Sequence, residues 1–302
     1  MNHSSPFQQT FRQPFQCRGV GLHSGQTSEM MLEPAPQGHG IVFERSDLDE
    51  KPKIHAHFSS VVNTFLCTQL GNNEGATVAT IEHLMAALAV CEVDNALVRL
   101  QGPEIPFMDG SSLPFIHMIE ATGLVKQSAS RPFLRVLKDV RLEGREGRFV
   151  QLSPAETFSA HVSFDFGGRQ GMGKYTSYFP GGLDAFKKDI AAARSFGFYE
   201  DAQKLYDKGL ALGASLENTV VIDSGKVMNP DGLRFNDEYV RHKILDAVGD
   251  LYLAGAPLQA AYTAHNPGHE WHHKLLQALF SDPSAWTYEE KTDKRVQSPA
   301  GD

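Results

Sequence analysis

The sequence predicts an α+β fold, with short strands and amphipathic helices mixed along the chain. Short runs rich in β-branched and aromatic residues alternate with Gly and Pro clusters such as 34–38, a pattern typical of strands joined by turns. Two segments, near 80–90 and 237–255, instead carry apolar residues at helical spacing. Each contains an apolar residue, a charged residue, a histidine and then an apolar helix face. A duplicated α+β unit and a chance match both explain this short repeat.

Length and composition describe a globular protein large enough for two domains. The chain has 302 residues, 41% of them hydrophobic and 21% charged, which are ordinary values for proteins with substantial cores. The formal net charge of −8 argues against a general nucleic-acid binder. Three irregularly spaced cysteines do not suggest a disulfide framework, which favours a reducing compartment. The N-terminus lacks a signal-peptide pattern and no apolar run approaches ~18 residues, so we expect no membrane span and a cytoplasmic location.

In the first half of the chain, strands separated by turns are interspersed with two helices. The expected strands are 15–22, 28–32, 40–43, 55–58 and 95–100, and the expected helices are 80–90 and 114–122. Thr77 or Thr80 is the expected cap of the first helix, and Gly123 is expected to end the second. The Ser, Ala and Pro residues of 126–132 predict a linker.

The second half resumes with strands and ends with helices. The expected strands are 133–142, 149–152, 160–166 and 220–222, and the expected helices are 183–193, 200–208, 237–255 and one that starts near 268. A glycine-rich loop is expected at 167–173. From 289 to 302 the chain is polar, and we expect this tail to be disordered.

The two histidine-bearing helices carry the residue types of a catalytic zinc site. His242 and Asp246 are four residues apart, which places them one turn apart on one helix face. With His83 they supply two imidazoles and one carboxylate, enough to hold Zn²⁺ and leave its fourth position to water. Glu82 is a candidate base for that water, and Asp250 can orient another group. We therefore predict a metal-dependent hydrolase, although each histidine can also be an ordinary packed or surface residue.

A second metal motif lies near the C-terminus. The segment 269–273 reads H-E-W-H-H and matches H-E-x-x-H, a zinc-protease signature. In that signature both histidines lie mid-helix, whereas Asn-Pro-Gly at 266–268 places His269 at a helix start or in a turn. We therefore interpret this match as accidental. His55 and His57 form an H-x-H pair that one face of a half-buried strand explains equally well.

Several motifs in a fixed order resemble those of a known family. They are Gly19-Val20-Gly21-Leu22-His23-Ser24-Gly25, Thr80-Ile81-Glu82-His83-Leu84, Glu104-Ile105-Pro106-Phe107-Met108-Asp109-Gly110-Ser111, Ala193-Arg194-Ser195-Phe196-Gly197-Phe198, Asp231-Gly232-Leu233-Arg234-Phe235, 240–251 and Gly268-His269. Over 19–286 the chain resembles the UDP-3-O-acyl-N-acetylglucosamine deacetylases, zinc enzymes of lipid A synthesis in Gram-negative bacteria.

The resemblance implies a fold of two similar α+β domains, at 1–127 and 133–288. Each would be a mainly antiparallel sheet with helices, and the helices would be sandwiched between the two sheets. An inserted β–α–β piece is expected near 197–222.

The resemblance also implies roles for the candidate residues. His83, His242 and Asp246 would hold one Zn²⁺ per chain, with Fe²⁺ as an alternative for the same ligands. Glu82 would be the general base that activates water.

Five further residues would complete the reaction and the binding of the nucleotide. His269 would be the acid that stabilises the oxyanion and protonates the leaving amine, held by Asp250. Lys243 would reach toward the nucleotide, and Phe196 would pack against the uracil. The family usually has threonine where this chain has Ser195, so the hydroxyl that donates to the carbonyl is kept and the methyl that restricts its rotamer is lost.

The implied substrate is an acylated UDP-sugar, bound by a monomer. Its acyl chain needs an apolar channel, and apolar side chains interrupt the polar stretch 198–221: Tyr199, Ala202, Leu205, Leu210, Ala211 and Leu216. Core packing of the inserted piece explains the same pattern. The alternative to an enzyme is a sugar-nucleotide or lipid-binding module with structural histidines.

Overall fold

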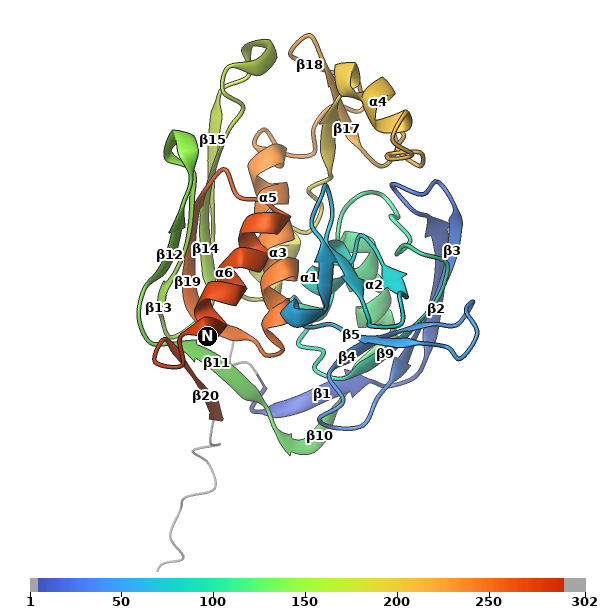
Figure 1. Ribbon diagram of the computed structural model, residues 1–302, viewed down its shortest axis with the longest axis vertical. Helices are drawn as coiled ribbons and strands as arrows, with labels where there is room; N and C mark the ends of the chain where they lie inside the picture. The colour runs from blue at the N-terminus through green and yellow to red at the C-terminus, as the bar shows by residue number, and fades with distance from the viewer. Residues whose placement is uncertain (1–4, 291–302) are drawn as a thin grey trace, which may run out of the picture.

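The computed structural model describes residues 5–290, which form the α+β fold that the sequence predicts (Figure 1). The α-helices are α1 (Glu82–Val90), α2 (Leu113–Thr122), α3 (Leu183–Asp189), α4 (Tyr199–Tyr206), α5 (Glu238–Leu251) and α6 (His269–Ser281). The strands of the first half are β1 (Phe7–Phe11), β2 (Phe15–Val20), β3 (Thr27–Pro34), β4 (Ile41–Arg45), β5 (Lys53–His55), β6 (Val61–Asn63), β7 (Gln69–Gly71), β8 (Thr77–Val78), β9 (Ala96–Gln101) and β10 (Leu124–Ser130). Those of the second half are β11 (Pro132–Val136), β12 (Val140–Glu143), β13 (Phe149–Pro154), β14 (Ser159–Asp165), β15 (Lys174–Phe179), β16 (Phe196–Phe198), β17 (Val220–Asp223), β18 (Lys226–Val227), β19 (Leu258–His265) and β20 (Trp286–Glu290).

The two large sheets repeat one strand order. The first runs β2-β3-β9-β4-β5, and the second contains β12-β13-β19-β14-β15. In both, the central strand pairs antiparallel with one neighbour and parallel with the other, and the remaining pairs are antiparallel. The second sheet is extended by β11 and β20. This shared order supports the duplicated unit over a chance match.

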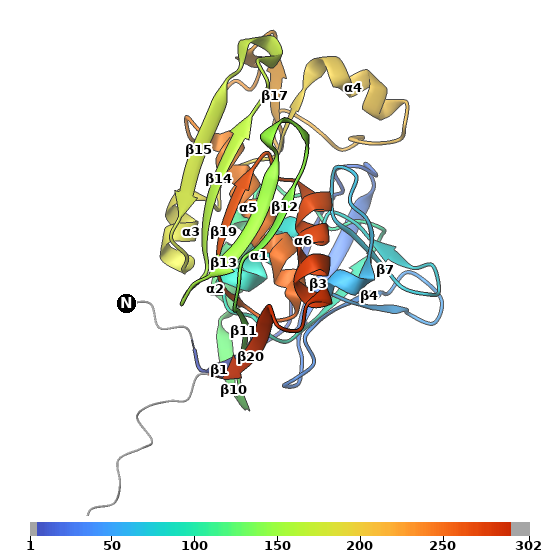
Figure 2. The same cartoon turned by 60° about the vertical axis from the view of Figure 1, so that its left-hand side comes forward.

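The long helices lie between these two sheets, as Figures 1 and 2 show. Helix α5 packs against α1 and α6 and against β14 and β15, and α6 packs on β12 and β13. One continuous cluster of buried apolar side chains joins the layers, including Leu84 and Leu88 of α1 and Ile244 and Leu245 of α5. The predicted division into domains at 1–127 and 133–288 stays a prediction.

Helices α1 and α5 touch through their backbones at Gly249. An ideal Cβ at position 249 would lie 2.0 Å from the carbonyl oxygen of Glu82 and 3.0 Å from the backbone nitrogen of Ala86. Glycine within a helix costs roughly 0.5–1 kcal/mol relative to alanine. A residue with low helix propensity therefore stands at position 249, where its small size lets the first turn of α1 lie against α5.

A β–α–β piece lies where an inserted one was predicted, near 197–222, but its being an insertion stays a prediction. It consists of β16, α4 and β17, and β16 pairs parallel with β17. In Figure 1 this piece lies at the top of the molecule, above α1.

The linker predicted at 126–132 is wrong. Strand β10 covers most of this segment and pairs antiparallel with β1, and β11 begins at Pro132. Its partner lies more than a hundred residues away in the sequence, so the local Ser and Ala signal could not reveal the pairing.

Two further predictions in the first half are wrong. Helix α1 has no side-chain cap, because Thr80 donates to Glu104 instead and Thr77 lies in β8. The strand expected at 55–58 ends at His55, and the His57 side chain caps a short 3₁₀ helix. The two histidines therefore do not share a strand face.

In the second half the errors concern element ends and one solvated strand. The strand expected at 133–142 is split into β11 and β12, and the helix expected at 183–193 ends at Asp189. Strand β15, which reads K-Y-T-S-Y-F and ends at the buried Phe179, was not predicted, although its alternating exposure and its aromatic residues are typical of a strand. Glu289 and Glu290, assigned to the tail, belong to β20 and pair with β11. The rest of the predicted tail, 291–302, lies outside the described residues.

The helices and the cysteines can be compared with two further expectations. Every helix within residues 5–290 is too short or too polar to cross a lipid bilayer. Cys17, Cys67 and Cys91 are all free, so the odd number of cysteines conceals no disulfide.

Replacing Gly249 with alanine is expected to destabilise the protein, although alanine is the better helix former. The new Cβ would meet backbone atoms of α1, which can move only if the helices separate. We expect the free energy of unfolding, measured by urea denaturation, to fall by about 1–3 kcal/mol. Gly173 has nothing within 4 Å of its ideal Cβ, so G173A is the matched control and should unfold like the wild type. Equal midpoints for G249A and wild type would contradict this packing.

Candidate functional site

The first turn of α1 carries Glu82 and His83 and is held by the loop that precedes it. Thr80 has a left-handed backbone, with φ of 59°, and its hydroxyl donates to Glu104 Oε1 at 2.7 Å. A β-branched residue keeps such a conformation only where contacts enforce it. These contacts therefore fix where α1 begins, and with it the positions of Glu82 and His83.

Helix α5 presents His242 and Asp246 from consecutive turns. The carbonyl of Ala193 lies 3.0 Å from Nδ1 of His242 and can only accept a hydrogen bond. Nδ1 therefore carries the proton, and Nε2 keeps a free lone pair, as in histidines that bind metals. The hydroxyl of Ser195 lies 3.0 Å from this Nε2 and donates to it.

Three candidate ligand atoms converge where α1 meets α5. Asp246 Oδ1 lies 3.3 Å from His242 Nε2 and 3.7 Å from His83 Nε2. The ligand atoms of these three residues all lie within 4.8 Å of one another. Atoms about 2.0–2.1 Å from one tetrahedral zinc ion lie about 3.3 Å apart. The observed spacing is therefore close to what a shared ion requires.

The protonation states at this position also fit a cation. Burial lowers the pKa of both histidines, that of His83 to about 3, so both rings are neutral at pH 7. Burial opposes the charge on Asp246, but His242 and Lys243 hold the pKa of this carboxyl well below its usual range. Asp246 Oδ1 is buried and has no hydrogen-bond partner within residues 5–290. A buried carboxylate oxygen is costly without a partner, and a divalent cation would supply one.

Glu82 lies beside these atoms with one oxygen anchored. Its Oε2 accepts a hydrogen bond from the backbone N–H of Thr68 at 3.1 Å. Burial raises the pKa of Glu82 to about 8, although the charge of His269 opposes this. A carboxyl with a raised pKa can take up and return a proton near neutral pH.

Asp250 lies one turn beyond Asp246 and is bound by three donors. Its Oδ1 accepts from the hydroxyl of Thr68 at 2.6 Å. Its Oδ2 lies 2.8 Å from His269 Nδ1 and 2.7 Å from His272 Nδ1. These donors hold the Asp250 carboxylate in one orientation.

His269 is the first residue of α6, at the helix end where the dipole disfavours positive charge. Burial would also lower its pKa, but the carboxylates of Asp250 and Glu82 outweigh burial and raise it to about 9. His269 is therefore cationic at neutral pH, which makes it a possible proton donor.

A cavity of about 1090 Å³ opens onto these groups. The predicted site residues that line it are Glu82, Ser195, Phe196, Tyr199, Ala202, Leu205, Ala211, Leu216, His242, Lys243, Asp246 and His269. His83 and Asp250 are not part of the lining. Leu210, predicted for the acyl channel, is half-buried at the turn after α4 and does not line the cavity either. The structure therefore brings the predicted residues to one place, apart from Leu210.

Lys243 and Phe196 lie together on the cavity wall. The Lys243 amine pairs with Asp246 Oδ2 at 2.8 Å and lies 5.3 Å from the centre of the Phe196 ring. Lys243 thus contributes charge directly to the candidate ligand Asp246, which follows it by three residues on α5.

The H-E-x-x-H match at 269–273 does not form a metal cluster among the described residues. Glu270 pairs with Lys274 on the surface at 2.6 Å, and His273 belongs to no group with metal-ligand spacing. The α6 residues that do belong to a group with metal-ligand spacing are His269 and His272, which lie close to Asp250 of α5.

Two residues of the site were missed by sequence reasoning. Thr68 lies between β6 and β7 and contacts both Glu82 and Asp250, but nothing in its local sequence indicates this. His272 follows His269 by three residues, a spacing that places both on one helix face. That spacing could have indicated that His272 lies near the same carboxylate as His269.

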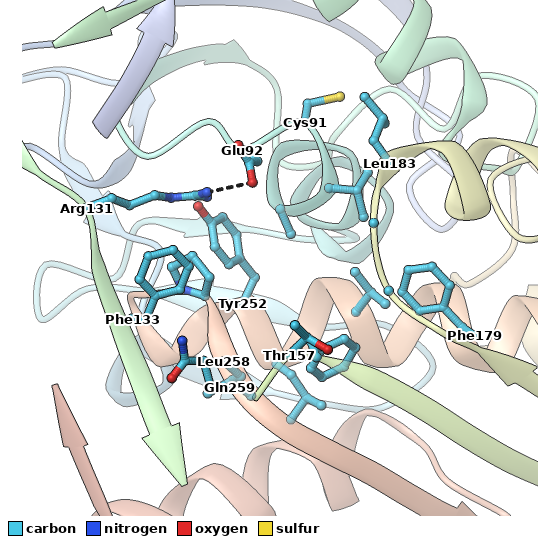
Figure 3. Close-up of a pocket in the computed structure, with 18 of the residues that line it drawn as sticks. Cys91, Glu92, Arg131, Phe133, Thr157, Phe179, Leu183, Tyr252, Leu258 and Gln259 are labelled. Atoms are coloured by element: carbon cyan, nitrogen blue, oxygen red, sulfur yellow. Dashed lines mark ion pairs between the residues drawn. The ribbon is translucent and has the colours of Figure 1, made fainter. Parts of the chain in front are cut away.

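Another cavity, of about 670 Å³, lies elsewhere in the fold (Figure 3). Its buried cation, Arg131, pairs with Glu92 Oε1 at 3.0 Å and with Asp94 Oδ1 at 2.7 Å. Figure 3 shows this guanidinium beside the Tyr252 ring. Two carboxylates thus neutralise Arg131, and these ion pairs join the residue between β10 and β11 to the segment after α1. No predicted site residue lines this cavity.

Comparison with known proteins gives the family of the chain. The model of the UDP-3-O-acyl N-acetylglycosamine deacetylase family matches residues 8–281. The chain belongs to this deacetylase family. UDP-3-O-acyl-N-acetylglucosamine deacetylase from Shewanella oneidensis is 40% identical over 294 residues, 96% of each chain. The deacetylase from Shewanella violacea is 42% identical over 286 residues, 93% of this chain and 92% of the relative. These matches confirm the resemblance drawn from the motifs.

The metal content of this deacetylase family member tests the three candidate ligands. We expect about one divalent cation per chain by mass spectrometry of the purified protein. A chelator should lower the thermal midpoint, because an ion that binds only the folded state stabilises it. H83A should lose the ion, whereas H273A should retain it. Loss from H273A with retention in H83A would favour the motif at 269–273 instead.

Proposed function

We propose that the protein is a zinc-dependent hydrolase that removes the N-acetyl group from UDP-3-O-(3-hydroxyacyl)-N-acetylglucosamine, the committed step of lipid A synthesis. The observation that carries this function is the convergence of a three-ligand group, a buried carboxylate and a cationic histidine on one cavity. Family membership and the names of the relatives indicate the substrate. Fe²⁺ suits the same ligands as Zn²⁺.

Glu82 is the proposed general base. A divalent cation held by His83, His242 and Asp246 would supply a Lewis acid that makes water nucleophilic near neutral pH and polarises the amide carbonyl. Thr68 occupies Oε2 of Glu82, so Oε1 is the oxygen left to accept the proton of that water. Such a base typically contributes ~10²–10⁴ in rate.

His269 is the proposed acid. Amide cleavage needs a proton on the leaving amine, because an amide anion is a very poor leaving group. Since Nδ1 of His269 is bound to Asp250, Nε2 is the atom that can face the substrate in the cavity. The ion pair keeps His269 protonated at neutral pH, so the proton is available when the C–N bond breaks.

Ser195 is the proposed donor to the acetyl carbonyl. Its hydroxyl now donates to Nε2 of His242, the nitrogen that would bind the cation. With that lone pair engaged as a ligand, the hydroxyl is free to turn toward the substrate oxygen. Losing one such donor typically costs ~3 kcal/mol of transition-state stabilisation.

The rest of the cavity suits the two ends of the proposed substrate. The wall formed by α4 and the loop after it is largely apolar and is lined by Tyr199, Ala202, Leu205, Ala211 and Leu216. Each methylene buried there is worth ~0.8 kcal/mol, so an acyl chain can supply much of the affinity. Lys243 and Phe196 lie near the candidate ligands and are the proposed contacts of the nucleotide.

Acetate release from the acylated UDP-sugar tests this function. The wild type should release acetate, and E82Q should lose ~10²–10⁴ in turnover because glutamine keeps the size of the side chain but cannot act as a base. E270Q is the matched control, since Glu270 lines the same cavity but pairs with Lys274 and should be dispensable. UDP-N-acetylglucosamine without the acyl chain should react far more slowly. No acetate from the wild type, or full turnover in E82Q, would contradict the proposed reaction.

The pH dependence of kcat/KM should be bell-shaped and should respond to Asp250. The rate rises as Glu82 loses its proton and falls at higher pH as His269 loses its own. A bound cation lowers both pKa values relative to those of the protein alone. D250N removes the charge that keeps His269 protonated, so the alkaline limb should move to lower pH by about one unit or more. An alkaline limb that stays in place in D250N would contradict the role of His269.

A further inference from the structure

His272 is completely buried and makes a contact that the proposed reaction does not use. Its Nδ1 lies 2.7 Å from Oδ2 of Asp250, and His269 Nδ1 lies 2.8 Å from the same oxygen. Two imidazoles on one face of α6 therefore share one carboxylate oxygen. His272 does not line the cavity, so it does not touch the substrate.

The hydrogen-bond geometry fixes what His272 can do. A carboxylate only accepts, so the Nδ1 atoms of both rings carry protons. Nε2 of His272 is buried and has no partner within the described residues, and the ring packs against Tyr262 with 5.7 Å between the ring centres. Within residues 5–290, the one hydrogen bond that the His272 ring makes is therefore the one to Asp250. A buried polar ring with a single bond needs a reason for its presence.

We propose that His272 is a positioning residue for the acid: it occupies part of Oδ2 of Asp250 and so limits how strongly Asp250 retains the proton on His269. A donor to a carboxylate stabilises the negative charge and weakens the pull of the carboxylate on another donor. Without His272, Asp250 would hold the His269 proton more tightly, and the acid would be weaker. This role rests on the proposed function, in which His269 must give up that proton.

The other titratable and charged groups around His269 do not depend on His272. Those on α1, α5 and the segment after β2 are Glu82, His83, His242, Asp246, Asp250 and His23. The guanidinium of Arg148, which precedes β13, lies beside Gly268. Thr68 holds the other oxygen of Asp250, so the carboxylate keeps its place when the His272 ring is replaced. The effect of His272 on His269 therefore passes through the shared oxygen.

Substitutions at position 272 test this role by NMR titration of the His269 ring in the full, metal-loaded protein, with H269N to assign its signals. H272L removes the donor, so the midpoint of His269 should rise by about half to one pH unit. H272N keeps an N–H near the position of Nδ1 and should restore the wild-type midpoint. H272Q places its amide near the position of Nε2 and should behave like H272L. The alkaline limb of kcat/KM should move with these midpoints.

H273N is the matched control. His273 is the next residue on α6, is half-buried and makes no hydrogen bond with Asp250, so its loss should leave the midpoint unchanged. A His269 midpoint that is unchanged or lower in both H272L and H272Q would overturn the role of His272. Should H272L fail to fold, the comparison of H272N with H272Q decides alone. The titration needs no substrate, so it stays readable even if the wild type releases no acetate.

Discussion

The close contact between α1 and α5 is the constraint on which the site depends. Gly249 lets the backbone of α5 lie against the carbonyl of Glu82, where any side chain would push the helices apart. The ligand group takes His83 from α1 and His242 and Asp246 from α5, and their spacing leaves little tolerance. A shift of even 1 Å between the helices would break the geometry that a tetrahedral ion requires.

The repeated strand order explains why the site lies between the sheets. Helix α1 precedes β9 and helix α5 precedes β19, and these strands hold the same place in their sheets. The two helices are therefore structural counterparts that meet across the centre of the molecule, each with a histidine. The two copies do not contribute the same functional residues, however. The first copy supplies Glu82, on α1. The second copy supplies Asp246 and Asp250, on α5, and His269, which follows the central strand β19.

Sequence reasoning succeeded where the relation between residues is local. The spacing of His242 and Asp246 predicts one helix face, and α5 places them there. His83 and His242 are far apart in the chain, so their spacing could not place them together. Their residue types predicted a shared ligand set, and the family resemblance implied the same set. The same limit explains the wrong linker at 126–132, which pairs with β1. Thr68 is the clearest case of this limit. Its contacts with Glu82 and Asp250 depend on the folded structure and not on the residues next to it in the sequence.

Two buried carboxylates of the site have opposite protonation properties because they have different partners. Glu82 has one backbone donor, and burial raises its pKa to about 8. Asp250 is equally buried, but the charge of His269, together with hydrogen bonds from His269 and His272, holds its pKa below the usual range despite burial. Burial alone would make both carboxyls bases. The charge of His269 and the hydrogen bonds from His269 and His272 instead keep Asp250 ionised. Asp250 therefore keeps His269 cationic, while Glu82 remains able to exchange a proton.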